Sequence, residues 1–89
     1  MSGGGSDLLR FPCEFPIKVM GRDCESFRSL TLAIVETHAG PLEPGRISER
    51  PSAKGNFVAL TYTIEAQSRE QLDAIYQELT DSGVVLVAL

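Results

Sequence analysis

The sequence contains no tryptophan, one histidine (His38) and only two cysteines, Cys13 and Cys24. A structural zinc site needs four ligands, usually Cys or His, so three such residues exclude a self-contained zinc site. Small disulfide-based scaffolds need a much higher cysteine content, and this class is excluded too. We therefore expect no bound metal, no other cofactor and a fold that is held together by an apolar core.

Long apolar runs and an excess of positive charge are also absent. The longest apolar run, residues 84–89, is far shorter than the roughly 20 residues that span a bilayer. Residues 1–7 have neither the basic start nor the apolar stretch of a secretory signal. Eight basic side chains stand against 12 acidic ones, a net charge of -4 that argues against nucleic acid as the partner. We expect a cytoplasmic protein that does not bind membranes.

The composition that remains is that of one ordinary globular domain. The chain has 89 residues, of which 43% are apolar and 22% are charged. Its first ten residues are rich in glycine and serine and bury too little apolar area to offset the entropy of ordering them. We predict a flexible N-terminal tail over residues 1–10, with Leu8 and Leu9 able to dock on the domain, and a single domain over residues 11–89.

Alternation of apolar and polar residues predicts the strands. Residues 15–20 form a first strand that Gly21 ends, and residues 57–66 form the clearest strand of the chain. Residues 46–50 fit only an edge strand because they are polar and precede a proline, and residues 84–89 form a last strand. The side chains expected on the buried side are Phe15, Ile17, Val19, Val58, Leu60, Tyr62, Ile64 and Ala66. Those expected on the opposite side of the third strand are Phe57, Ala59, Thr61, Thr63 and Glu65.

Two helices are predicted from apolar residues that recur every three or four positions. Asp23 is a suitable N-cap for the first helix, and Gly40 in the left-handed conformation, followed by Pro41, ends it. The expected apolar face of this helix consists of Phe27, Leu30, Ile34 and His38. Ser68 and Gln71 match a capping box that begins the second helix. Its apolar stripe is Leu72, Ile75, Tyr76 and Leu79.

The resulting order is strand, helix, strand, strand, helix, strand. This order predicts an α+β protein with the ferredoxin-like βαββαβ sandwich, in which two helices cover one face of a four-stranded antiparallel sheet. We expect the first and third strands in the middle of the sheet and the second and fourth at its edges. The turn at residues 52–56 joins two of them, with Gly55 and Asn56 supplying positive φ angles.

Several segments carry a family resemblance. They are the phrases LRFP at residues 9–12, FPIKVMG at 15–21 and PSAKGNF at 51–57, with the stretch around Leu72, Ile75, Tyr76, Glu78 and Leu79. In this combination the sequence resembles the YbeD-like family of small bacterial proteins of unknown function. The resemblance implies the βαββαβ fold and a similarity to ACT-type regulatory domains, which bind amino acids or related small molecules. It brings no established activity and no catalytic residues.

The corner between the first strand and the first helix is the expected ligand site, formed by Met20, Gly21 and Arg22. In ACT-like domains this corner commonly contacts the ligand. Free N–H groups at a helix start bind anions, and glycine lets the backbone approach a ligand closely. The alternative is a tight turn that Asp23 caps, with no ligand.

Uneven charge and an unprotected edge favour a protein partner. Arg46, Arg50 and Lys54 lie in the second strand and its turn, whereas the second helix is acidic. Residues 84–89, which include Val87, have no charged side chain to blunt an edge strand. We therefore expect Arg46, Arg50, Lys54 and Val87 to contact a second copy of the chain or another protein.

Isolated reactive residues have structural explanations. We expect His38 to interact with the end of its helix, since no nucleophile accompanies it. Cys24 lies where a helix start favours a thiolate, but the acidic neighbours Asp23 and Glu25 oppose this and favour an inert thiol. A disulfide between Cys13 and Cys24 is geometrically possible, but it is not expected in a reducing cytosol. Residues 54–57 resemble an RNA-binding signature, but Asn56 stands where an aromatic side chain must stack a base.

Two functions follow from these observations. The first is a non-catalytic regulatory module that senses a small metabolite at the Gly21 corner. The second is a protein-interaction module that acts as a homodimer or on an enzyme partner. An enzyme is not expected, because the sequence pairs no nucleophile with a base and no two carboxylates at a workable spacing.

Overall fold

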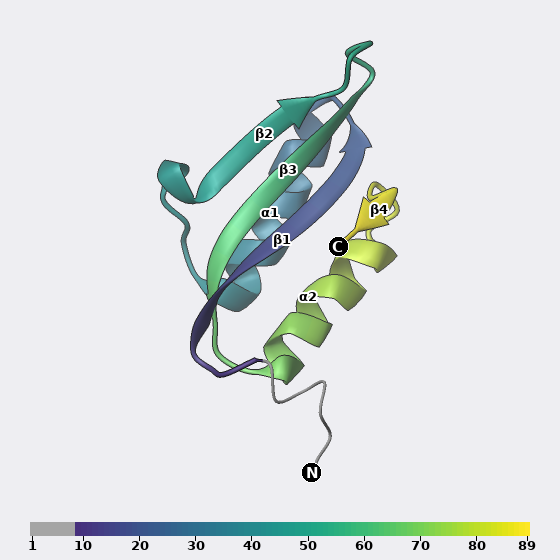
Figure 1. Ribbon diagram of the computed structural model, residues 1–89. Coiled ribbons are helices and arrows are strands. Elements are labelled where there is room, and N and C mark those ends of the chain that lie inside the picture. The colour runs from purple at the N-terminus through teal and green to yellow at the C-terminus, as the bar shows by residue number, and fades with distance from the viewer. Residues whose placement is uncertain (1–8) are drawn as a thin grey trace.

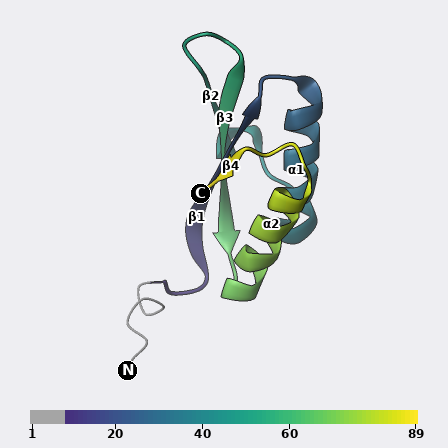
Figure 2. The ribbon, with the colours of Figure 1, turned by 90° about the vertical axis from the view of Figure 1, so that its right-hand side faces the viewer.

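Residues 9–89, which the computed structural model describes, form a four-stranded antiparallel sheet with two helices on one face (Figures 1 and 2). Residues 1–8, with most of the predicted tail and Leu8, lie outside this range. The elements are β1 (Cys13–Arg22), α1 (Glu25–Ala39), a 3-10 turn η2 (Pro44–Arg46), β2 (Ile47–Pro51), β3 (Phe57–Ala66), α2 (Arg69–Asp81) and β4 (Val87–Ala88). The sheet order β2-β3-β1-β4 confirms the fold class and the two central strands. No helix in this range is long and apolar enough to cross a bilayer.

The central pair of strands, β1 and β3, is hydrogen-bonded along its whole length. The pairing runs from Cys13 opposite Ala66 to Arg22 opposite Phe57. Side chains alternate between the helix-covered core and the opposite face, as the sequence predicted. Gly21 does not end the first strand, because it pairs with Val58 inside β1.

Helix α1 begins one residue later than expected. Cys24, with extended backbone, is the N-cap residue and makes no capping hydrogen bond with its side chain. The expected cap, Asp23, instead accepts a hydrogen bond of 2.7 Å from the Arg28 guanidinium. Gly40 ends the helix as predicted and has the positive φ that favours glycine, 84°, but its ψ of 173° lies outside the left-handed helical region.

The buried face of α1 consists of Phe27, Thr31, Ile34 and Val35. Leu30, expected in the core, is 39% exposed. Thr31 is buried instead, which is possible because its hydroxyl group forms hydrogen bonds inside the core. The Thr31 hydroxyl donates to the Phe27 carbonyl at 2.8 Å, which leaves the Tyr62 hydroxyl, 2.6 Å away, to donate to Thr31 Oγ1. Burial raises the pKa of Tyr62, so this side chain stays neutral at ordinary pH.

Helix α2 begins with the predicted capping box. The Ser68 hydroxyl accepts from the Gln71 N–H at 3.1 Å, while Gln71 Oε1 accepts from the backbone N–H of Gln67, the residue before the cap. Gln71 also donates to the carbonyl of His38 at 3.0 Å, which joins the ends of the two helices. Leu72, Ile75 and Leu79 are buried as expected, and Tyr76 is half-buried.

The two edges of the sheet differ from their predicted bounds. The last strand is only Val87–Ala88 rather than residues 84–89, because residues 84–86 cross from α2 to the sheet. Backbone bonds of 2.8 and 3.0 Å between Lys18 and Leu89 hold its end to β1. At the other edge β2 is confirmed, displaced by one residue from the expected 46–50. In the turn before β3 only Gly55 has a positive φ, so the expectation for Asn56 was wrong.

The core lies between the sheet and the helices, and its buried apolar members come from β1, β3 and both helices. Leu9 packs against its margin, in line with the expectation that this residue docks. β2 contributes only the half-buried Ile47. The register of β3 therefore decides which side chains stabilise the domain.

We predict that Leu60→Ala lowers the free energy of unfolding by about 2–5 kcal/mol, because it leaves a cavity in the core. Its neighbour Thr61 points to the opposite face, so Thr61→Ala serves as the matched control and has a much smaller effect. Urea denaturation of both variants provides the measurement. Equal losses would contradict the register of β3.

Candidate functional site

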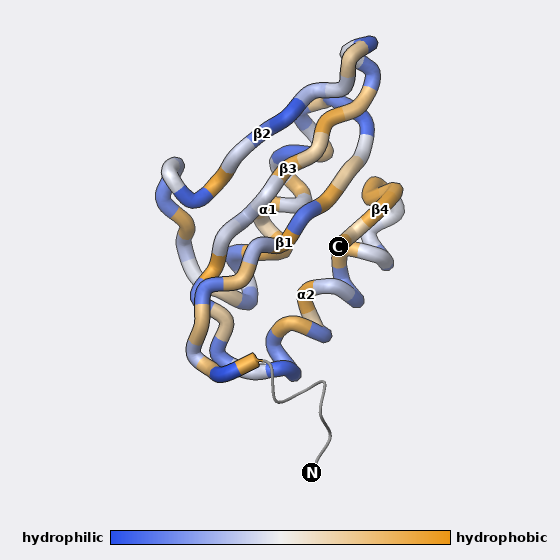
Figure 3. The backbone as a smooth tube through the Cα atoms, viewed as in Figure 1, coloured by the Kyte–Doolittle hydropathy of each residue, from blue (hydrophilic) through white to orange (hydrophobic). Residues whose placement is uncertain are grey.

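The sheet face opposite the helices is not covered by any of residues 9–89, and Figure 2 shows both helices on the other side. We call this surface the open face. Four of its apolar side chains are substantially exposed: Met20 (43%), Phe57 (36%), Val87 (45%) and Leu89 (71%). Together with the half-buried Ala59 they form what we call the apolar patch. In Figure 3 the apolar colour of β4 lies at the edge of this surface.

Strand register brings the members of the apolar patch together. Met20 lies directly opposite Ala59 on one side and Val87 on the other. Two shallow hollows meet at Met20 and Ala59. One, of about 150 Å³, extends to Val87 and Leu89, and the other, of about 230 Å³, extends to Phe57 and Arg50. The patch is therefore a continuous surface across three strands rather than a set of scattered exposed residues.

Basic side chains border the apolar patch. Lys18 and Arg50 line a third hollow of about 350 Å³ beside it, and Arg22 lies opposite Phe57. None of these three cations forms an ion pair with any of residues 9–89. This contrasts with Arg28, which binds Asp23 at 2.7 Å and Glu49 at 2.8 Å. The hydrogen bond from the Arg28 guanidinium lowers the pKa of Glu49, and the bonds to Glu49 and Asp23 raise the pKa of Arg28.

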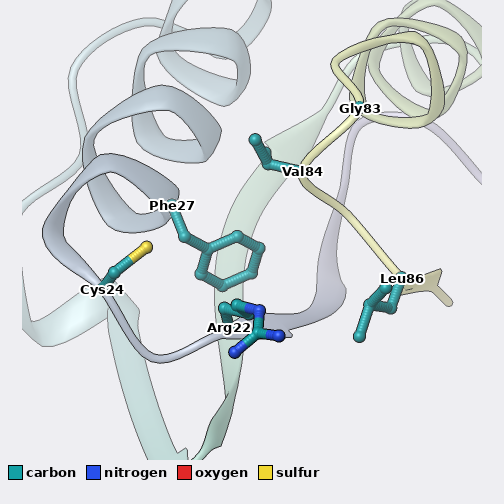
Figure 4. A pocket seen from close by; sticks show the side chains of 6 residues that line it. All are labelled: Arg22, Cys24, Phe27, Gly83, Val84 and Leu86. Atoms are coloured by element: carbon teal, nitrogen blue, oxygen red, sulfur yellow. The ribbon is translucent and has the colours of Figure 1, made fainter.

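The expected ligand corner holds a hollow of about 260 Å³, which we call the corner hollow (Figure 4). It is lined by Arg22, Cys24, Phe27, Gly83, Val84 and Leu86. Of the three residues expected there, only Arg22 lines it. Met20 belongs to the open face, while Gly21 is buried beneath the ring of Phe27. A Cβ atom on Gly21 would lie 2.3 Å from Phe27 Cε1, so the glycine allows the ring to pack on β1.

Cys24 lies at the margin of the corner hollow and is exposed. Its Sγ is 3.3 Å from the Ser26 hydroxyl, and this hydrogen bond is the main cause that lowers the pKa of Cys24. The pKa of Cys24 is therefore shifted in the direction opposite to the one expected from Asp23 and Glu25. Both cysteines are free. Cys13 begins the ten-residue strand β1 and Cys24 follows its end, so roughly 30 Å of extended chain separates them and no disulfide can form.

His38 lies in the last turn of α1, as expected, but its ring contacts the other helix. His38 Nε2 lies 2.7 Å from Glu78 Oε1 of α2. Because both residues belong to helices, which lie on one side of the sheet (Figure 2), this contact is away from the open face. Among residues 9–89 no three His, Cys, Asp or Glu side chains come together as metal ligands.

The residues expected at a partner surface are spread over the sheet. Val87 belongs to the apolar patch, and Arg50 borders it. Lys54 lies in the exposed turn between β2 and β3, and Arg46 binds Glu14 at 2.7 Å near the opposite end of β1. Met20, expected at a ligand corner, lies instead at the centre of the patch. The alternation of β1 indicates this position, because Met20 is an apolar residue at an outward place.

Comparisons with known proteins agree on one family. A family model described as "Protein of unknown function (DUF493)" matches residues 6–89. A UPF0250 protein of Paraburkholderia phytofirmans is 42% identical over 89 residues, which is 100% of both chains. A UPF0250 protein of Neisseria gonorrhoeae is 40% identical over 84 residues, 94% of this chain and 92% of that one.

The fold is similar to that of a solved structure. The solution structure of protein HP0495 from H. pylori covers 91% of this chain and 85% of its own, with a TM-score of 0.65 and 16% identity. At this identity the likeness concerns the fold alone.

We predict that Gly21→Ala lowers the free energy of unfolding by about 1–3 kcal/mol, because the new methyl group overlaps the Phe27 ring and the Val84 carbonyl. Gly45 is the matched control, since a Cβ atom there meets nothing within 4 Å. Urea denaturation measures both variants. If the Phe27 ring is what the new methyl group overlaps, the effects of Gly21→Ala and Phe27→Leu on the free energy of unfolding are not additive in the double variant. A Gly21→Ala variant as stable as Gly45→Ala would contradict this packing.

Proposed function

We propose a function from the surfaces of the protein, because the chain belongs to DUF493, the YbeD-like family of small bacterial proteins of unknown function. The proposed function is that of a non-catalytic protein-interaction module whose open face binds another protein. The observation that supports this most is the apolar patch centred on Met20. Contiguous exposed apolar surface with a polar border is typical of protein-binding sites.

The layered fold gives a physical reason for this role. A sheet is stable when at least one of its faces is packed, and the two helices already supply that packing here. Thr61 and Thr63 are compatible with solvent on the other face. Burial of the exposed side chains of Met20, Phe57 and Val87 away from water would lower the free energy of the protein. Since the core does not need these three side chains, their exposure is best explained by a partner.

The chemistry of the open face suits binding rather than catalysis. Its centre consists of apolar side chains, with Lys18, Arg50 and Thr61 beside them. The carboxylates Glu14 and Glu65 lie at the far end of the same face. The two tyrosines lie elsewhere: burial raises the pKa of both Tyr62 and Tyr76, and the Tyr76 hydroxyl donates to the Leu89 carbonyl at 2.6 Å. Among residues 9–89 no hydrogen bond on this face joins a general base to a nucleophile, which supports the proposal of a module without catalytic activity.

A second candidate is the sensing of a small metabolite in the corner hollow. Apolar surface from Phe27 and Val84 beside the Arg22 guanidinium favours a small ligand that combines an apolar part with an anionic group. Its volume of about 260 Å³ lies just below the usual range for ligand pockets. A metabolite bound there shifts the NMR signals of Arg22, Cys24 and Phe27, whereas a partner on the open face shifts those of Met20 and Ala59.

We predict that Met20→Glu abolishes co-purification of the specific partner, because a carboxylate then interrupts the patch. Leu30→Glu on α1 is the matched control, since Leu30 is 39% exposed and Met20 is 43% exposed. The full chain with each substitution is used as bait, and mass spectrometry compares the proteins recovered with those that the wild type recovers. Thermal melts check that both variants fold.

Loss of the same protein from the Met20 variant alone supports the open face as the binding surface. Equal recovery with all three baits contradicts it. Loss with Leu30→Glu and not with Met20→Glu moves the interface to the helical layer.

A further inference from the structure

We propose that the open face binds a segment of another protein that carries an apolar side chain with acidic side chains about 7 Å to either side of it. This inference rests on the proposed function and names the chemistry of its partner. It follows from the position of the unpaired cations around Met20.

The apolar patch lies in a basic part of an acidic protein. The net charge of the chain is -4, yet Lys18 and Arg50 line the hollows of the patch. Arg22 lies at the end of β1 opposite Phe57, between the patch and the corner hollow. None of the three has an ionic partner among residues 9–89. Glu49 borders the same hollow as Arg50, but its carboxylate is held by Arg28 at 2.8 and 3.2 Å. These cations are therefore available to a partner.

Strand geometry fixes the pattern that the partner must match. Arg50, Ala59, Met20 and Val87 form one row across the four strands, because each lies directly opposite the next. Lys18 and Arg22 lie two residues before and after Met20 on β1, on the same face. Two residues of a strand span about 7 Å, so the backbone positions of Lys18 and Arg22 each lie about that far from that of Met20.

An acidic and apolar segment gains from both features of this surface. An apolar side chain over Met20 and Ala59 removes the patch from water. Carboxylates placed beside Lys18 and Arg22 form charge-assisted hydrogen bonds, and Arg50 offers the bidentate geometry that carboxylates prefer. Because complementary charge also suppresses wrong partners, this arrangement selects against basic segments.

A second copy of the chain matches the pattern less well. When two open faces meet with their patches in contact, Lys18, Arg22 and Arg50 of each copy also approach one another. When one copy is reversed along the strands, these cations approach Glu14 and Glu65 at the other end of the sheet, but the patch then faces Pro16 and Thr63. Neither arrangement satisfies charge and apolar contact together, so a different protein is the better occupant.

The experiment places a photo-reactive phenylalanine analogue at position 61, in the middle of the open face, in the full chain inside bacterial cells. A matched control carries the analogue at position 29, on the exposed side of α1. After irradiation, mass spectrometry identifies the partner segments that are cross-linked from each position. We expect segments from position 61 that contain an apolar residue flanked by Asp or Glu.

Charge reversal supplies the second readout. With the analogue at position 61, Lys18→Glu and Arg50→Glu reduce the yield of these cross-links about tenfold or more, because like charges then meet in the interface. Arg69→Glu is the matched control, since Arg69 is an exposed cation on α2 without an ionic partner in residues 9–89, and it leaves the yield unchanged.

The other possible results contradict either the inference alone, the identity of the partner, or the proposed function as well. Neutral or basic segments from position 61, or a yield that charge reversal does not change, overturn the inference and leave the interaction role in place. Cross-links chiefly between two copies of the chain replace the proposed partner by a homodimer. Position 61 yielding no more than position 29 contradicts both the inference and the proposed function.

Discussion

The structure depends on the antiparallel pairing of β1 with β3, which runs along ten residues of each strand. Because side chains alternate along a strand, this one register determines which residues enter the core and which reach the open face. Val19 and Leu60 are buried for the same reason that Met20 and Ala59 face outward. A displacement of one residue exchanges the two faces, so core stability and the binding surface cannot change independently.

Contacts between the layers hold the helices on their side of the sheet. Phe27 packs directly on the backbone of Gly21, and the buried Thr31 and Tyr62 hydroxyls satisfy each other across the core. At the edge, Arg28 of α1 binds Glu49 of β2, which ties the most polar strand to the helical layer. Arg28 thus binds the carboxylates near β2, whereas Lys18 and Arg50 on the open face bind no carboxylate among residues 9–89. The open face, which the helices leave uncovered, therefore has both exposed apolar side chains and cations without ionic partners among residues 9–89.

Much of the fold could be predicted from the sequence because alternation and capping are local signals. The bounds of β3 and the cap at Ser68 are confirmed on this ground. Thr31 in place of Leu30 could not be predicted, because the burial of its hydroxyl depends on Tyr62, 31 residues away. For a similar reason the sequence predicts that Gly21 ends the first strand, because the contact that explains this glycine, with Phe27, exists only after α1 packs on β1. Of the residues that the sequence predicts for a site, Val87 lies in the apolar patch and Arg50 borders it, while Met20, predicted for a ligand corner, lies at the centre of the patch.

The central claim is that the open face is the surface that a partner covers, and the methionine methyl groups test it most directly. The chain has two methionines, Met1 and Met20, and Met20 lies at the centre of the apolar patch. NMR of methyl-labelled protein with a soluble paramagnetic agent measures how accessible the Met20 methyl group is to solvent. We predict strong relaxation of its signal in the free protein and marked protection once the purified partner is bound. A Met20 signal that remains equally accessible in the complex would contradict the account.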